Sequence, residues 1–173
     1  HIEITRDIAN KFNNHFGKTF VVPKEHIVES VAVVPGIDGE KMSKSYDNTI
    51  EIFEPEKQMK KKVMRILTDS TGVDEPKNPD TCNVFALLKL FATDSELADW
   101  RAKYQKGGMG YGEAKKRLAE LMNDYFAPYR QKREEIGADR AYIRKVLDDG
   151  ADRARQIAGE TLKRAKEAVG LRR

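Results

Sequence analysis

The spacing of the apolar residues changes along this chain, and that change limits which folds are possible. Residues 2–16 carry an apolar residue at every fourth position from Ile4 onward, the pattern of an amphipathic helix, and Gly17 follows as a typical helix-ending residue. Short runs rich in β-branched residues come next, at 20–22 and 31–34, and a proline follows each of them. These runs predict buried strands or strand-like core segments.

From about residue 55 the apolar spacing becomes helical. Pro55 suits the first position of a helix that runs to about residue 68. Its inward stripe is predicted at Met59, Val63, Ile66 and Leu67. Residues 69–82 hold a glycine and two prolines among polar residues, which indicates a loop. The dense apolar residues between 84 and 91 then predict a short buried helix.

The rest of the chain predicts further helices. Thr93 or Asp94 is expected to cap a helix whose inward residues are Leu97, Trp100 and Tyr104. Residues 107–112 are rich in glycine but follow no strand, which favours a turn between helices over a phosphate cradle. A long helix is expected next, kinked at Pro128, with Leu118 and Met122 facing inward. Two more helical segments are predicted at 139–148 and 151–169.

These elements predict a mainly α chain in two parts. A helix, a buried strand and a phosphate-binding loop together form a piece of a doubly wound, Rossmann-like α/β domain, which we assign to residues 1–54. Residues 55–173 are predicted to form an all-helical bundle. The first part has too few strands to close a sheet, so we expect it to leave sheet edges and one helix face uncovered.

Composition limits the cellular compartment and the kinds of ligand that we expect for this protein. Apolar residues make up 39% and charged residues 35%, a balance that suits a soluble helical protein, and no apolar run approaches the ~20 residues that a membrane span needs. Cys82 is the single cysteine, which excludes an internal disulfide and fits a reducing compartment. The three histidines are scattered without metal-ligand spacing. We expect a cytoplasmic protein with no membrane partner and no metal held by this chain.

Basic residues are concentrated in three places, at 57–65, 130–145 and 163–173, and the net charge is +4. Clusters of this kind are compatible with a polyanionic partner. Acidic residues interleave most of them, so solvated helix faces explain the pattern equally well. Both interpretations remain open.

Residues 41–45, Lys-Met-Ser-Lys-Ser, form the most distinctive local sequence. Glycines, a proline and small polar residues flank them, which predicts a mobile loop in which Gly36 and Gly39 allow opening and closing. Lys41 and Lys44 are suited as point charges for a triphosphate, and Ser43 and Ser45 offer hydroxyl and backbone donors. Met42 is expected to dock the loop against apolar surface. The alternative is an ordinary solvated loop that contains two lysines.

The pentapeptide Lys41-Met42-Ser43-Lys44-Ser45 resembles the second signature of class I aminoacyl-tRNA synthetases. The wider sequence is most similar to the bacterial tryptophanyl-tRNA synthetases, with resembling segments at 1–9, 68–70, 106–112 and 146–151. The resemblance implies amino-acid activation with ATP and Mg²⁺, with Lys41 and Lys44 as catalytic residues that stabilise the pyrophosphate leaving group. Residues 41–45 would bind ATP, and the adenine would lie against the backbone near Ala32 and Val33.

The same resemblance implies partners. The helical part would contact the anticodon end of a tryptophan tRNA, and the parent protein would bind tryptophan and form a homodimer. The family's first signature, its amino-acid pocket and its Gly-Glu-Asp-Gln segment have no counterpart in these residues. We therefore expect the chain to correspond to the C-terminal half of a synthetase and to be inactive alone.

Two other hypotheses remain at this point. A tyrosyl-type synthetase shares the signature loop and the first helix. A non-catalytic module that binds RNA or a protein through its helices belongs to a different functional class. Tryptophan-dependent activation separates these alternatives.

Overall fold

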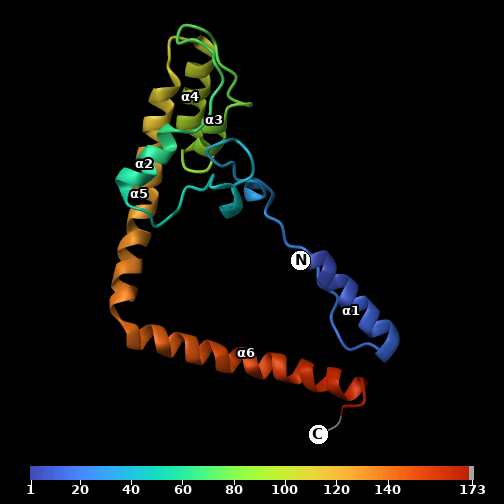
Figure 1. The fold of residues 1–173 in the computed structure, drawn as a ribbon. Helices are drawn as coiled ribbons and strands as arrows, with labels where there is room; N and C mark the ends of the chain where they lie inside the picture. Colours follow the sequence, from blue (N-terminus) through green and yellow to red (C-terminus); the bar gives the residue numbers. More distant parts are fainter. Residues whose placement is uncertain (172–173) are drawn as a thin grey trace. The chain divides into compact units, whose positions relative to one another are not determined.

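The computed structural model describes residues 1–171, and its regular structure is helical (Figure 1). The chain divides into two units, Glu29–Glu134 and a second that joins His1–Val28 to the residues from Glu135 onward. The helices are α1 (Ile2–Phe16), α2 (Glu56–Met64), α3 (Asn83–Leu88), α4 (Asp94–Lys106), α5 (Tyr111–Ala138) and α6 (Arg140–Ala168), with short 3₁₀ turns η1 (Glu29–Val31) and η2 (Lys44–Tyr46). None of the helices in the described range is both long and apolar enough to cross a membrane.

The prediction of α1 is confirmed, and its C-terminal turn is held by a side chain. Gly17 follows the helix with φ +86°, a conformation that favours glycine. The Asn13 Oδ1 atom accepts hydrogen bonds from the N–H groups of Thr19 and Phe20, both at 2.9 Å. The Phe20 ring packs edge-on against the Phe12 ring, and the two ring centres lie 4.7 Å apart. The chain therefore folds back on α1 immediately after the helix ends.

The prediction of buried strands at 20–22 and 31–34 is wrong for this chain. Residues 1–171 contain no strand, only an isolated antiparallel bridge between Pro35 and Lys41. Val21 is 90% exposed and Val33 is 64% exposed. A strand pairs its backbone groups with neighbouring strands, and the described residues supply no such neighbour. Val21 and Val33 therefore remain largely exposed, whereas Val34 is half-buried and packs against the hydrophobic core.

The hydrophobic core of the Glu29–Glu134 unit is formed mainly by α2 to α5. Its members include Met59, Val63, Ile66, Phe85, Leu88, Trp100, Tyr104, Leu118 and Met122. The predicted inward stripe of α2 is confirmed except at Leu67, which is 58% exposed. Because α2 ends at Met64, the Leu67 N–H does not continue the helix and instead donates to the Ile37 carbonyl at 2.7 Å. Leu67 is therefore part of a loop contact and not of the core.

The glycine-rich segment is a turn between helices, as predicted. α4 ends at Lys106 and α5 begins at Tyr111, so residues 107–110 connect two helices. Gly107 has φ +77°, and a Cβ there would lie 2.5 Å from the Asp74 carbonyl oxygen. Cys82 is buried, and its Sγ lies 3.6 Å from the Tyr104 hydroxyl.

The C-terminal prediction of two helical segments is wrong, because α6 is one continuous helix from Arg140 to Ala168. Asp139 caps it, since its carboxylate accepts from the Tyr142 N–H at 2.8 Å. Gly150 lies inside the helix, where one glycine costs about 1 kcal/mol relative to alanine and is outweighed by its helix-favouring neighbours. No residue of α6 is buried. Pro128 lies inside α5, which continues to Ala138.

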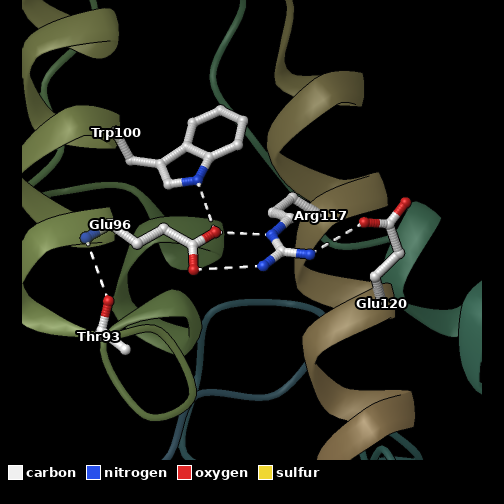
Figure 2. A network of polar contacts seen from close by, with 5 residues as sticks. All are labelled: Thr93, Glu96, Trp100, Arg117 and Glu120. Carbon is white, nitrogen blue, oxygen red and sulfur yellow. Dashed lines mark hydrogen bonds and ion pairs between the residues drawn. The ribbon is translucent and has the colours of Figure 1, made fainter.

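Polar side chains join α4 to α5 at one point of the core (Figure 2). The Thr93 hydroxyl caps α4 by accepting from the Glu96 N–H at 3.3 Å, which confirms Thr93 as the cap. The Glu96 carboxylate accepts from Arg117 Nε at 2.6 Å and Nη2 at 3.3 Å, and from Trp100 Nε1 at 3.4 Å. The hydrogen bond from Arg117 lowers the pKa of Glu96 below its ordinary value of 4.5.

This ion pair gives stability a defined pH dependence. Because the pKa of Glu96 is lowered in the folded protein, its stabilisation is present above pH 4.5 and is lost as pH falls through the lower, folded pKa. Glu96→Gln should lower the free energy of unfolding by about 1 kcal/mol at neutral pH. Urea unfolding at neutral and acid pH should show the difference from wild type shrinking below pH 4.5.

Glu120→Gln is the matched control for this measurement. Glu120 also contacts Arg117, at 3.2 Å, but its side chain is 63% exposed. Exposed pairs contribute little, so this variant should change the free energy of unfolding by less than about 0.5 kcal/mol. Equal losses in the two variants would contradict the assignment of the stabilisation to Glu96.

Candidate nucleotide-phosphate site

The Lys-Met-Ser-Lys-Ser segment lies on a narrow, hairpin-like loop. The Met42 N–H donates to the Val34 carbonyl at 2.8 Å, and the Gly36 N–H donates to the Glu40 carbonyl at 2.7 Å. These two bonds hold residues 40–42 beside residues 34–36, so the chain doubles back just before the lysine tip. Met42 is half-buried against the hydrophobic core, so the prediction that it docks the loop is confirmed.

The tip of the loop is a short capped turn. The Ser43 hydroxyl accepts from the Ser45 N–H at 3.3 Å, at the start of η2. Asp47 ends the turn in the left-handed conformation, with φ 51°. Lys41, Lys44 and Ser45 are exposed. The structure therefore presents both predicted lysines to solvent on a loop whose base is fixed.

The base is organised around Asn48, which is 1% exposed. Its Oδ1 accepts from the Ser43 N–H at 2.7 Å, and its Nδ2 donates to the Lys41 carbonyl at 3.2 Å. The same Nδ2 donates to both carboxylate oxygens of Asp38, at 2.9 and 3.1 Å. The Glu40 N–H also donates to Asp38, at 3.0 Å, a side-chain bond to the backbone two residues on that is typical of a turn. Sequence reasoning missed Asn48, because nothing in its local pattern predicts burial.

The glycines of the loop allow close packing. A Cβ at Gly36 would lie 2.5 Å from Asn48 Cγ, and one at Gly39 would lie 2.5 Å from Asn83 Nδ2. Gly39 also has φ +88°. The prediction that the two glycines act as hinges stays a prediction, whereas their need for space is a property of this structure.

Gly36→Ala should therefore displace the Asn48 side chain and free the Ser43 N–H. We expect amide hydrogen exchange at Ser43 to become at least about ten times faster, because its buried acceptor is lost. Gly72→Ala is the control, since a Cβ there meets only the end of the Glu75 side chain, at 3.6 Å. Unchanged exchange at Ser43 in Gly36→Ala would contradict the close packing.

The structure places Ala32 and Val33 immediately before this site. Both are exposed, and Val34, the next residue, provides the carbonyl that holds Met42. The predicted adenine contact is therefore adjacent to the loop in the chain. No group of three His, Cys, Asp or Glu side chains within the described residues is arranged to hold a metal ion.

The predicted basic clusters are partly paired. Lys62 contacts the buried carboxylate of Glu54 at 3.1 Å. The Arg133 guanidinium lies 4.8 Å from the centre of the Phe53 ring, and Arg130 Nη2 donates to the Asn123 carbonyl at 3.1 Å. In the second unit, Arg140 and Arg144 line an open groove at the start of α6 together with Gly137, Ile143 and Leu147. Some cations of the 130–145 cluster thus face a groove, while others stabilise the fold.

Comparison with known proteins identifies the class. Residues 1–127 match the model of the family described as class I tRNA synthetases (W and Y), and the chain belongs to this family. It is 48% identical over 172 residues to the tryptophan–tRNA ligase of Rhodopirellula baltica, with 99% of this chain and 54% of that protein covered. Identity to the tryptophan–tRNA ligase of Campylobacter jejuni is 46% over 171 residues, again over 54% of that protein.

Comparison of the fold with solved structures supports the same family. The crystal structure of tryptophanyl-tRNA synthetase from C. jejuni, complexed with ADP and tryptophan, superposes with a TM-score of 0.81 at 46% identity. The alignment covers 99% of this chain and 54% of that one. The chain thus spans about half the length of the relatives it matches. The resemblance inferred from the loop and the four other segments is confirmed.

Proposed function

We propose that the protein containing this chain is a tryptophan–tRNA ligase. It activates tryptophan with ATP to an aminoacyl-adenylate and transfers the amino acid to its tRNA. The observation that carries the proposal is the exposed pair Lys41 and Lys44 on a loop fixed at its base, in a chain similar throughout to ligases named for tryptophan. The C. jejuni synthetase structure contains ADP and tryptophan, which supports the use of a nucleotide by this protein.

The chemistry requires little acid–base catalysis. The tryptophan carboxylate is already ionised when it attacks the α-phosphorus of ATP, so the main tasks are orientation and stabilisation of the charge that builds on pyrophosphate. Lys41 and Lys44 are assigned this task, Ser43 and Ser45 are assigned as hydroxyl and backbone donors to the phosphates, and Met42 completes the ATP-binding segment by docking it on the core. Ala32 and Val33 are assigned to the adenine.

Magnesium is assigned to ATP and not to this chain. Mg²⁺ usually reaches such sites on substrate phosphates, with few protein ligands. The described residues offer no cluster of three candidate ligands, so they do not fit a resident metal, and no step is assigned to one here.

The remaining features of the proposal follow from the family. Residues 1–54 are assigned to the end of a Rossmann-like catalytic domain, and residues 55–173 to a helical domain that contacts the anticodon end of the tRNA. The parent protein is proposed to be a cytoplasmic homodimer. The exposure of Val21 and Val33 supports the assignment of residues 1–54 to part of a larger domain, because exposed apolar side chains mark a contact surface.

A tyrosyl-type ligase is the second candidate, because the matching family model covers both amino acids. The named relatives with 42–48% identity are tryptophan–tRNA ligases, which favours tryptophan. Pyrophosphate exchange by the full-length protein with each amino acid tests the choice. Exchange with tyrosine alone would overturn the proposal, and no exchange with either would favour the non-catalytic RNA- or protein-binding module.

The 173-residue chain alone should not catalyse activation. It spans about half of its relatives, and the family's first signature and amino-acid pocket are not among its residues. We expect no tryptophan-dependent pyrophosphate exchange above background, with the full-length protein as the positive control. Measurable exchange by the short chain would show that these residues carry a complete site.

A further inference from the structure

We infer that Asp38 and Asn48 form a positioning pair that sets the backbone geometry of the lysine tip for catalysis. The inference rests on the proposed function, since it concerns the same loop. Asn48 makes four side-chain hydrogen bonds, at 2.7, 3.2, 2.9 and 3.1 Å, to Ser43, Lys41 and Asp38. It therefore holds the backbone on both sides of Met42.

Asp38 fixes which way the Asn48 amide faces. An ionised carboxylate only accepts hydrogen bonds, so the amide must direct Nδ2 toward Asp38 and Oδ1 away from it. Only that orientation lets Oδ1 accept from the Ser43 N–H while Nδ2 donates to the Lys41 carbonyl. Only one orientation of the Asn48 amide therefore satisfies all of these hydrogen bonds.

Burial makes the arrangement costly to leave. Asn48 is 1% exposed, so removal of its amide leaves the Ser43 N–H and the Lys41 carbonyl without their buried partner. The Asn48 main chain is held separately, because its carbonyl accepts from the Ile37 N–H at 3.0 Å. A side-chain substitution therefore acts on the lysine segment more than on the path of the loop.

The pair acts through the lysines and not on substrate. Asn48 is buried, whereas Lys41 and Lys44 are exposed, and Lys44 directly follows the Ser43 whose N–H is held. Long lysine side chains depend on their backbone for placement, and an error of about 1 Å in a reacting geometry can cost about 10²-fold in rate. Asn48 and Asp38 are accordingly positioning residues.

The test is a double-mutant cycle in the full-length protein, measured by tryptophan-dependent pyrophosphate exchange. Asn48→Ala should lower kcat about 10²-fold, with tryptophan binding unchanged. If Asn48 acts through Lys44, the double variant Asn48→Ala with Lys44→Ala should be no slower than Lys44→Ala alone. Asn78→Ala is the control, because Asn78 also holds a loop N–H, that of Asp80 at 2.9 Å, and it is exposed and outside this loop.

A pair of near-isosteric variants removes the ambiguity of a folding defect. Asn48→Asp keeps the acceptor for Ser43 but places a second carboxylate against Asp38, and it should be slow. The swap of Asn48→Asp with Asp38→Asn restores one donor between the two side chains and keeps the acceptor for Ser43, but it leaves the Lys41 carbonyl without its donor, so recovery should be partial. We expect it to recover at least about tenfold in kcat over Asn48→Asp.

The possible results distinguish a failure of the positioning pair from a failure of the proposed ligase function. Multiplicative losses in the Asn48 and Lys44 cycle, or no recovery in the swap, would overturn the positioning pair while the loss in Lys44→Ala leaves the proposed function standing. A wild-type protein that gives no tryptophan-dependent exchange would overturn the proposed function and the pair with it.

Discussion

Lys44→Ala in the full-length protein should slow tryptophan-dependent pyrophosphate exchange by about 10²- to 10³-fold, which is the usual cost of removing one group that stabilises transition-state charge. Lys44 is exposed at the start of the 3₁₀ turn η2, where its ammonium group can reach a bound phosphate. Tryptophan binding should be unchanged, because the assigned task of Lys44 arises only as pyrophosphate leaves.

Lys60→Ala is the matched control for Lys44→Ala. Lys60 is also exposed and lies on α2, outside the loop. It should leave the exchange rate unchanged. Equal losses of tryptophan affinity and of rate in Lys44→Ala would argue against a transition-state role, because they would indicate uniform binding.

Leu118→Ala should lower the free energy of unfolding of the 173-residue chain by about 3 kcal/mol, the usual cost of a cavity in place of a buried leucine. Leu118 is 0% exposed in the core, on the inward face of α5. Trp100, the only tryptophan of the chain, is 7% exposed in the same core and gives the fluorescence signal for urea unfolding.

Leu67→Ala makes the same chemical change at a site that is 58% exposed. It should cost less than about 1 kcal/mol, since little apolar surface is removed from a buried environment. The Leu67 N–H bond to Ile37 is retained in the variant, because it involves only main-chain atoms. A loss as large as that of Leu118→Ala would mean that Leu67 is buried in solution, as its apolar spacing originally predicted.

Local sequence was sufficient where local chemistry determines the structure. The fourfold apolar spacing before Gly17, the Thr93 cap and the glycine turn after Lys106 each depend on residues close together in the chain, and each prediction is confirmed. The predictions that Leu67 is buried and that residues 20–22 and 31–34 form strands were wrong, because they depend on contacts between distant parts of the chain. Whether an apolar run is buried depends on partners distant in sequence, and the described residues provide none for Val21 or Val33.

For the candidate site too, local sequence predicted some residues and not others. Lys41 and Lys44 were predicted from a five-residue motif, because a loop that binds phosphates would need its cations close together, and this prediction remains to be tested by Lys44→Ala. Asn48 was not found, because its importance comes from burial and from the three residues that its side chain joins. An asparagine in a polar loop has no pattern that distinguishes a buried clamp from a solvated turn residue.

Cys82 gives this chain an internal reporter of core dynamics. It is the only cysteine, it is 7% exposed, and its thiol lies beside the Tyr104 hydroxyl within the helical core. A bulky thiol reagent reaches such a sulfur only when the surrounding helices separate transiently. The alkylation rate of Cys82 therefore measures how often the helical core opens, at a single atom and without any engineered probe.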